Sequence, residues 1–329
     1  MGKTGQQPIK RRHHTVPKFY LSRFANERDQ IIRVPLPGDK RATVSINNAS
    51  VVKDFYLLET SRGVFTDAIE DELGDIEGEA ATAFHAVIDL AQWPPTDEHR
   101  RAIAKWAATQ HVRVPRMRQR GDEIADLTLK MQVAVGGKPQ ARRLMEKTEK
   151  REISNEEVEK WWKKISNFDS YHVRQHPNTH LQLMLNLMPR AAWHFFNRPW
   201  GLMRFSRRAL ITGDDPVVLN PRDGASPYEG VGLVTAGSFL IPLDRRVALV
   251  INNTSHGDDY ELEPSTFMAN QINQMVALNA HRAIFHHPDD NPLKPLVIPK
   301  PADREMTPSS GPEDFLMPDG WPSPAPKGE

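Results

Sequence analysis

Two adjacent histidines, His13 and His14, lie in the basic N-terminal segment, and imidazoles can both bind metal ions and move protons near neutral pH. Successive side chains of an extended segment point in opposite directions, so one ring can bind a ligand while the other does chemistry. Asp214 is a further candidate. Gly213 permits a tight turn and Pro216 disfavours helix before it, so the carboxylate is expected at the end of a strand. The alternative is an Asx turn, in which this carboxylate accepts backbone N–H groups.

These residue types suit metal-dependent cleavage of a phosphodiester bond. We expect His14 to act as general base, and His13 and Asp214 to be ligands of a divalent metal ion, which would be Mg²⁺, Mn²⁺ or Zn²⁺. The two histidines could also exchange these roles. The partner in this hypothesis is a nucleic acid or a nucleotide.

Charged side chains interrupt the apolar stripes of two expected helices. Glu70 and Glu77 share one face of the helix that begins near Thr66, and Gln110 and Arg113 lie on the apolar side of the next helix. Because an unpaired buried charge is costly, we predict that Arg113 pairs with Glu70 or Glu77. The pair is either structural, or Glu77 and Arg113 are catalytic and the guanidinium stabilises developing phosphate charge.

Residues 13–24 resemble the opening His-His-x-Val-Pro-x-x-Tyr-Leu-x-x-Phe of a bacterial family known as domain of unknown function 4238. The resemblance covers roughly residues 10–287. Gly213 departs from the serine that is usual in the family's Thr-Ser-Asp-x-Pro turn. The family has no settled activity, so the resemblance places residues without assigning their chemistry. The matching positions include His13, His14, Val16, Pro17, Tyr20, Leu21, Phe24, Glu70, Glu77, Gln110, Arg113, Pro115, Asp214, Pro242, Leu243, Asn273, Ala280 and Arg282, of which Glu70, Gln110, Asn273 and Arg282 complete the candidate polar cluster.

The His-His-x-Val-Pro segment also resembles, over five residues, the start of some His-Asn-His-type nucleases. Two hypotheses therefore stand. In the first, the protein is a metal-dependent phosphodiesterase or nuclease, such as a bacterial defence or toxin effector. In the second, it is a non-catalytic module that binds a ligand or partner and uses the polar cluster structurally. His13 or His14 within metal-ligand reach of Asp214 would favour the enzyme, and histidines bonded only to backbone carbonyls would favour the module.

Hydrophobic periodicity indicates which elements position these residues. The β-branched runs 31–36 and 42–46 flank a Pro-Gly turn and predict a hairpin. Helical periods dominate from residue 66 to residue 196, and strand-like runs follow Pro199. We therefore predict an α+β fold in which a mostly antiparallel sheet, formed from N- and C-terminal segments, packs on a central helical insertion.

The 329 residues carry 43 basic and 42 acidic side chains and no cysteine, which excludes disulfides and thiol nucleophiles. We expect a basic flexible N-terminus over 1–12 and a single compact domain over 13–287, with a helical part at about 66–196 and a β-rich part at about 199–287. The Pro-rich acidic tail 288–329 is expected to be disordered and dispensable for the fold. No leader and no membrane span is expected, so we predict a cytoplasmic protein.

Overall fold

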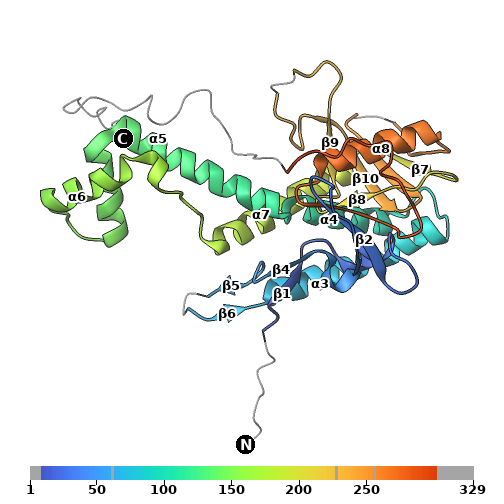
Figure 1. Cartoon of the computed structure of the whole chain (residues 1–329), viewed down its shortest axis with the longest axis horizontal. Coiled ribbons are helices and arrows are strands. Elements are labelled where there is room, and N and C mark those ends of the chain that lie inside the picture. The colour runs from blue at the N-terminus through green and yellow to red at the C-terminus, as the bar shows by residue number, and fades with distance from the viewer. Residues whose placement is uncertain (1–8, 61–62, 227–228, 255–256, 302–329) are drawn as a thin grey trace, which may run out of the picture. The chain divides into compact units, whose positions relative to one another are not determined.

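The computed structural model describes residues 9–60, 63–226, 229–254 and 257–301 (Figure 1). The chain divides into two compact units. The first contains the described parts of Met1–Arg116 and Pro177–Ala302, and the second contains Met117–His176. The helical part predicted at about 66–196 is thus shared between the units. Helices and mostly antiparallel sheets together confirm the predicted α+β class.

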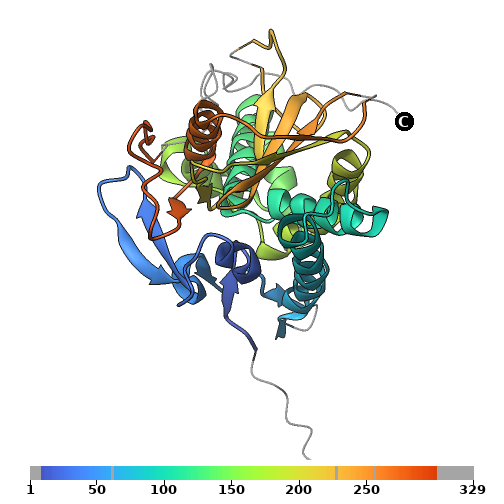
Figure 2. The ribbon, with the colours of Figure 1, turned by 90° about the vertical axis from the view of Figure 1, so that its right-hand side faces the viewer.

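A five-stranded sheet in the first unit is built entirely from the C-terminal half of the chain (Figure 2). Its strand order is β12-β7-β11-β10-β9, and all neighbours are antiparallel except β12 with β7. Side chains alternate between its faces: Phe239 and Ile241 belong to the main core, and Leu240 to a second core. The strands are β7 Trp200–Arg204, β9 Val218–Pro221, β10 Ala236–Asp244, β11 Val247–Asn252 and β12 Tyr260–Leu262.

A four-stranded antiparallel sheet joins the two ends of the chain, in the order β3-β2-β13-β8. The β2–β3 hairpin confirms the one predicted from the β-branched runs. Two small sheets pair β1 with β4 and β5 with β6. The strands are β1 Arg12–His14, β2 Gln30–Pro35, β3 Ala42–Ser45, β4 Val51–Lys53, β5 Leu58–Glu59, β6 Phe65–Thr66, β8 Thr212–Gly213 and β13 Ala283–His286.

Helices α3, α4 and α7 surround the main core with the five-stranded sheet, and α8 contributes to the second core. Trp106 of α4 is fully buried, with its ring 4.9 Å from that of Phe84 and 5.0 Å from that of Tyr20. The Thr96 hydroxyl accepts the N–H of His99 and so caps the start of α4. The helices are α1 Lys18–Ser22, α2 Ile46–Ala49, α3 Ala68–Phe84, the π-helical turn η1 His85–Asp89, α4 Asp97–Val112, α7 Pro177–Phe196 and α8 Thr266–Asn279.

The second unit is a small helical body with its own core. Helix α5 (Pro115–Glu149) enters it from the first unit and is broken at Gly137, whose φ of 56° and ψ of −153° are not helical. A capping box between Ser154 and Glu157 starts α6 (Asn155–Ile165), which is followed by the short helix η2 (Phe168–Ser170). Val133 and Phe168 are buried in this core.

The segment predicted as a proline-rich tail falls into two parts. Residues 288–301 are described, and Leu293 is buried in the second core, with Leu296 and Ile298 packed against it. Residues 302–329 lie outside the described residues, as do residues 1–8 of the predicted flexible N-terminus. Among the described residues, no helix is both long and apolar enough to cross a membrane.

Candidate functional site

The two histidines of β1 point in opposite directions, as expected for a strand. His13 is completely buried, and both of its ring nitrogens bond to the backbone. Nδ1 accepts the N–H of Tyr56 at 2.8 Å, so Nε2 carries the proton that is donated to the Lys10 carbonyl at 2.9 Å. Burial lowers the pKa of His13, which keeps the ring neutral. Neither nitrogen has a lone pair left for a metal ion.

His14 is half-buried and less constrained. Its Nε2–H donates to the Asn47 carbonyl at 3.2 Å, which leaves the lone pair of the neutral ring at Nδ1. Burial lowers the pKa of His14, so the ring is neutral at pH 7. Of the predicted catalytic groups, His14 therefore keeps an atom that can accept a proton.

Asp214 follows β8, and its carboxylate binds backbone N–H groups, although these belong to a distant segment and not to the local Asx turn of the alternative prediction. Its carboxylate oxygens accept the backbone N–H groups of His281 and Arg282, each at 2.8 Å. Burial raises the pKa of Asp214. In the part of the chain that the structure describes, no three His, Cys, Asp or Glu side chains are grouped so that they could hold a metal ion. The predicted donors His13 and Asp214 are thus engaged by separate backbone segments and do not fit a divalent ion.

The predicted ion pair between the two helices is confirmed. Arg113 is 1% exposed, and its Nη1 donates to Glu77 of α3 at 2.9 Å. Its Nε and Nη2 both donate to the side-chain oxygen of Gln110, at 3.0 and 2.8 Å. Gln110 in turn donates to the Thr15 carbonyl at 2.8 Å. This chain of bonds fastens the N-terminal segment to α3 and α4, and it engages the guanidinium on three of its nitrogens.

Two further groups complete the polar cluster. Burial and the nearby Glu77 carboxylate both raise the pKa of Glu70. The Tyr56 hydroxyl is buried and has no hydrogen-bond partner among the described residues. The positive charge of Arg113, with a smaller contribution from Lys10 at Glu70, offsets the carboxylates of Glu70 and Glu77.

The remaining predicted site residues lie elsewhere in the first unit. Asn273 of α8 is fully buried; its side chain accepts the N–H of Ile211 and donates to the carbonyl of Ala209, each at 2.9 Å. Arg282 has an exposed side chain, and it is its backbone N–H that meets Asp214. Asn273 and Arg282 therefore do not take part in the contacts of the Arg113 cluster.

Sequence reasoning missed three other polar contacts of buried groups, two of Tyr20 and one of Asp215. The buried Tyr20 hydroxyl donates to the Pro242 carbonyl at 2.6 Å and bonds the Thr212 hydroxyl at 2.7 Å. Arg116 pairs with Asp215 at 2.5 Å. The position of Tyr20 in the histidine motif was the available signal, although its partners lie about two hundred residues away.

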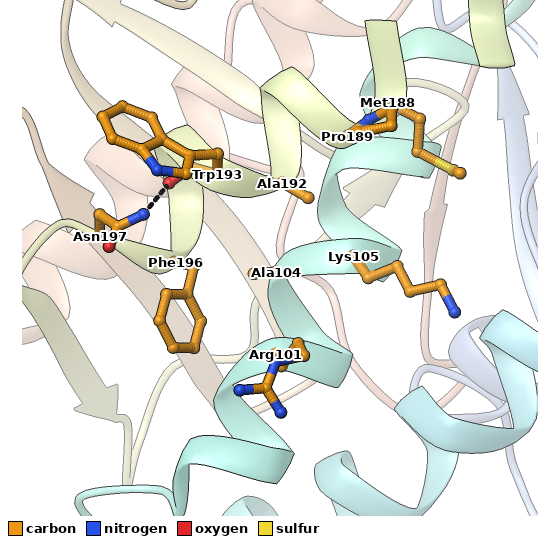
Figure 3. A pocket seen from close by; sticks show the side chains of 9 residues that line it. All are labelled: Arg101, Ala104, Lys105, Met188, Pro189, Ala192, Trp193, Phe196 and Asn197. Carbon is orange, nitrogen blue, oxygen red and sulfur yellow. Dashed lines mark hydrogen bonds between the residues drawn. The ribbon is translucent and has the colours of Figure 1, made fainter. Parts of the chain in front are cut away.

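A groove between α4 and α7 was also missed (Figure 3). The two helices run antiparallel, because Thr109 bonds Met188 at one end and Arg100 bonds the Phe196 carbonyl at the other. The groove encloses about 360 Å³ and is mostly apolar. It is lined by Arg101, Ala104, Lys105, Met188, Pro189, Ala192, Trp193, Phe196 and Asn197.

Exposed aromatic and cationic side chains distinguish this groove. Trp193 is 63% exposed, although large aromatic rings are usually buried. Arg101 stacks over Phe196 at 5.7 Å, and Lys105 pairs with Glu79 at 3.3 Å on an exposed surface. The sequence contained a signal for this groove: residues 179–196 hold more apolar side chains than the single stripe by which a half-buried helix packs on a core.

Comparison with known proteins identifies the family of this chain but no activity. It matches no curated protein and no solved structure. A family model matches residues 12–290, close to the extent of the predicted resemblance, and that family is described only as a protein of unknown function. With its strands, paired histidines and Arg113 cluster all inside the matched region, the chain belongs to the family of unknown function DUF4238.

Proposed function

We propose that this protein is a binding module whose ligand occupies the groove between α4 and α7. The observation that carries the proposal is the exposure of Trp193 within an apolar hollow that has two cations on one wall. Covering a large apolar side chain stabilises a complex by about 2 kcal/mol, so this surface favours association. The chemistry fits a ligand with an apolar body and a negative charge.

The polar cluster supports the same proposal, because its bonds suit a structural role. The His13 ring, the Asp214 carboxylate and the Gln110 amide all bond to backbone groups. The ring of His14 bonds only a backbone carbonyl, as expected for a module, whereas His13 bonds one carbonyl and one backbone N–H. In this proposal the cluster holds the chain ends around the helices, and the ligand binds elsewhere.

Binding of anilinonaphthalene sulfonate to the full-length protein tests the proposal, because this dye has an apolar ring system and one negative charge. We expect saturable binding that weakens about tenfold in Trp193→Ala, which corresponds to about 1.4 kcal/mol. Phe267→Ala is the matched control, since Phe267 is 70% exposed on α8, away from the groove. Equal dye binding by wild type and Trp193→Ala, with unchanged melting temperatures, would remove the groove as the binding site.

The phosphodiesterase hypothesis keeps one supporting observation, the lone pair of His14 Nδ1. The purified protein should be assayed with DNA, RNA and nucleotides in the presence of Mg²⁺, Mn²⁺ or Zn²⁺. Turnover that disappears in His14→Ala, while folding is retained, would favour the enzyme over the module. Turnover that persists in His14→Ala would point to a contaminant or to another site.

A further inference from the structure

The outward face of α7 carries two rows of apolar side chains. Leu185, Pro189 and Trp193 form one row at four-residue spacing, and Met188, Ala192 and Phe196 form the next. Residues at this spacing share a helix face, and the stripe extends for about 16 Å. Leu185 is 41% exposed and Trp193 is 63% exposed. The first row is therefore open to solvent over about two helical turns, and the second row is partly buried against the main core.

The opposite wall of the groove is cationic. Arg101 and Lys105 are one turn apart on the same side of α4, with the small residue Ala104 beside them. Arg101 forms no ion pair within the described residues, and the only carboxylate bonded to Lys105 in that part of the chain is the exposed Glu79. An exposed pair of this kind is weak and can be exchanged for another carboxylate.

The floor of the groove is made of small side chains. Ala104 of α4 and Ala192 of α7 both line it. Small residues allow a third helix to approach within the usual interhelical distance of about 8–10 Å. Two antiparallel helices with an apolar seam thus present the geometry that a further helix can complete.

We propose that the groove docks an amphipathic helix of a partner protein. The partner's apolar side chains, at positions i, i+3, i+4 and i+7, pack against the α7 stripe, and two of its carboxylates spaced i, i+4 meet Arg101 and Lys105. This inference rests on the proposed function and names the partner of the same site. Single-stranded nucleic acid fits less well, since it requires successive flat rings along a basic track, whereas only Trp193 and Phe196 of this lining are aromatic.

A synthetic helix provides the probe. A fluorescein-labelled, side-chain-stapled peptide of about 16 residues, roughly 24 Å long, carries leucines at the stated spacing and two glutamates spaced i, i+4. A second peptide replaces only these glutamates with lysines. Fluorescence anisotropy with the full-length protein should show that the glutamate peptide binds about tenfold more tightly than the lysine peptide.

A charge reversal on the protein then tests the assigned contact. In Arg101→Glu/Lys105→Glu the preference should reverse in favour of the lysine peptide. The matched control is Arg143→Glu/Lys147→Glu, two exposed bases with the same i, i+4 spacing on α5, which should leave the preference unchanged. Equal affinities of the two peptides for wild type, or a glutamate preference that survives the Arg101/Lys105 reversal, would overturn the inference.

Other occupants are distinguished by the Trp193→Ala variant. A thymidine oligonucleotide that binds wild type more tightly than the peptides, and is lost in Trp193→Ala, would replace the helix with nucleic acid and leave the proposed function standing. Self-association that is lost in the same variant would replace the partner with a second copy of this chain. Failure of both the dye and the peptides to depend on Trp193 would overturn the proposed function itself.

Discussion

Helix α4 carries arginines in two contrasting surroundings. Arg113, which caps its C-terminal end, is 1% exposed and bonds Glu77 and Gln110. Arg101, three turns earlier, lies on the exposed wall of the groove and stacks over Phe196. The same side chain thus serves the fold at one end of the helix and remains available to a ligand at the other. Solvation and partners, more than residue type, decide which role a charge has.

The contrast extends to the regions around the two arginines. In the polar cluster, His13 and Gln110 each satisfy backbone groups of distant segments, and Asn273 does the same outside it. In the groove, apolar side chains are left without a cover. Residues that looked catalytic in the sequence thus stabilise the fold. The exposed surface of the groove is made of residues that form no catalytic motif.

The largest difference in the free energy of unfolding is expected between substitutions of Arg113 and Arg101. Arg113→Met removes the donors of Glu77 and Gln110 inside the protein and should lower the free energy of unfolding by about 3 kcal/mol. Arg101→Met should change it by less than about 0.5 kcal/mol, because Arg101 is exposed. Urea denaturation of both variants measures the contrast. Similar losses in the two variants would show that the distinction between the regions is wrong.

The histidine pair provides a second contrast. His13→Ala strands the Lys10 carbonyl and the Tyr56 N–H and should cost about 2 kcal/mol of stability. His14→Ala removes only the 3.2 Å hydrogen bond from the half-buried His14 ring to the Asn47 carbonyl, and should cost no more than about 1 kcal/mol of stability. Chemical denaturation measures the stability loss of each variant. A larger loss for His14→Ala than for His13→Ala would contradict the assignment of His13 as the structural histidine.

The pH dependence of His13 sharpens this assignment. Because burial lowers its native pKa below the unfolded value near 6.5, the unfolded chain binds the proton more readily, and the stability due to His13 is lost as the pH falls through and below 6.5. The stability advantage of wild type over His13→Gln should therefore shrink by about 1 kcal/mol from pH 7 to pH 5. Taking the difference removes the contributions of other groups, such as Glu70. A constant advantage across this range would mean that the native ring titrates normally.

The smallest effect on stability is expected for Trp193→Ala in the groove. Trp193→Ala removes a side chain that is 63% exposed, so the free energy of unfolding should change by less than about 0.5 kcal/mol. Thermal and urea denaturation, with Phe267→Ala as control, measure it. A loss comparable to that of Arg113→Met would show that Trp193 supports the core, and the groove would then not be a free binding surface.

Local patterns in the sequence were sufficient for the elements and for one tertiary contact. The alternation of β-branched residues predicted the β2–β3 hairpin, and helical periodicity predicted α3 and α4. The pairing of Arg113 with Glu77 was predictable because opposite charges on two apolar stripes must meet or remain uncompensated. The α+β class followed from the order of these patterns along the chain.

Tertiary structure alone decided what the motif residues do. Asp214 meets backbone N–H groups 67 and 68 residues further along the chain, and the His13 ring meets the N–H of Tyr56, 43 residues away. No local pattern specifies such partners, since any buried donor within reach can satisfy the same acceptor. The groove likewise depends on how α4 and α7 are paired, because a helical stripe records which residues are apolar but not which of them remain uncovered once the neighbouring helices have packed.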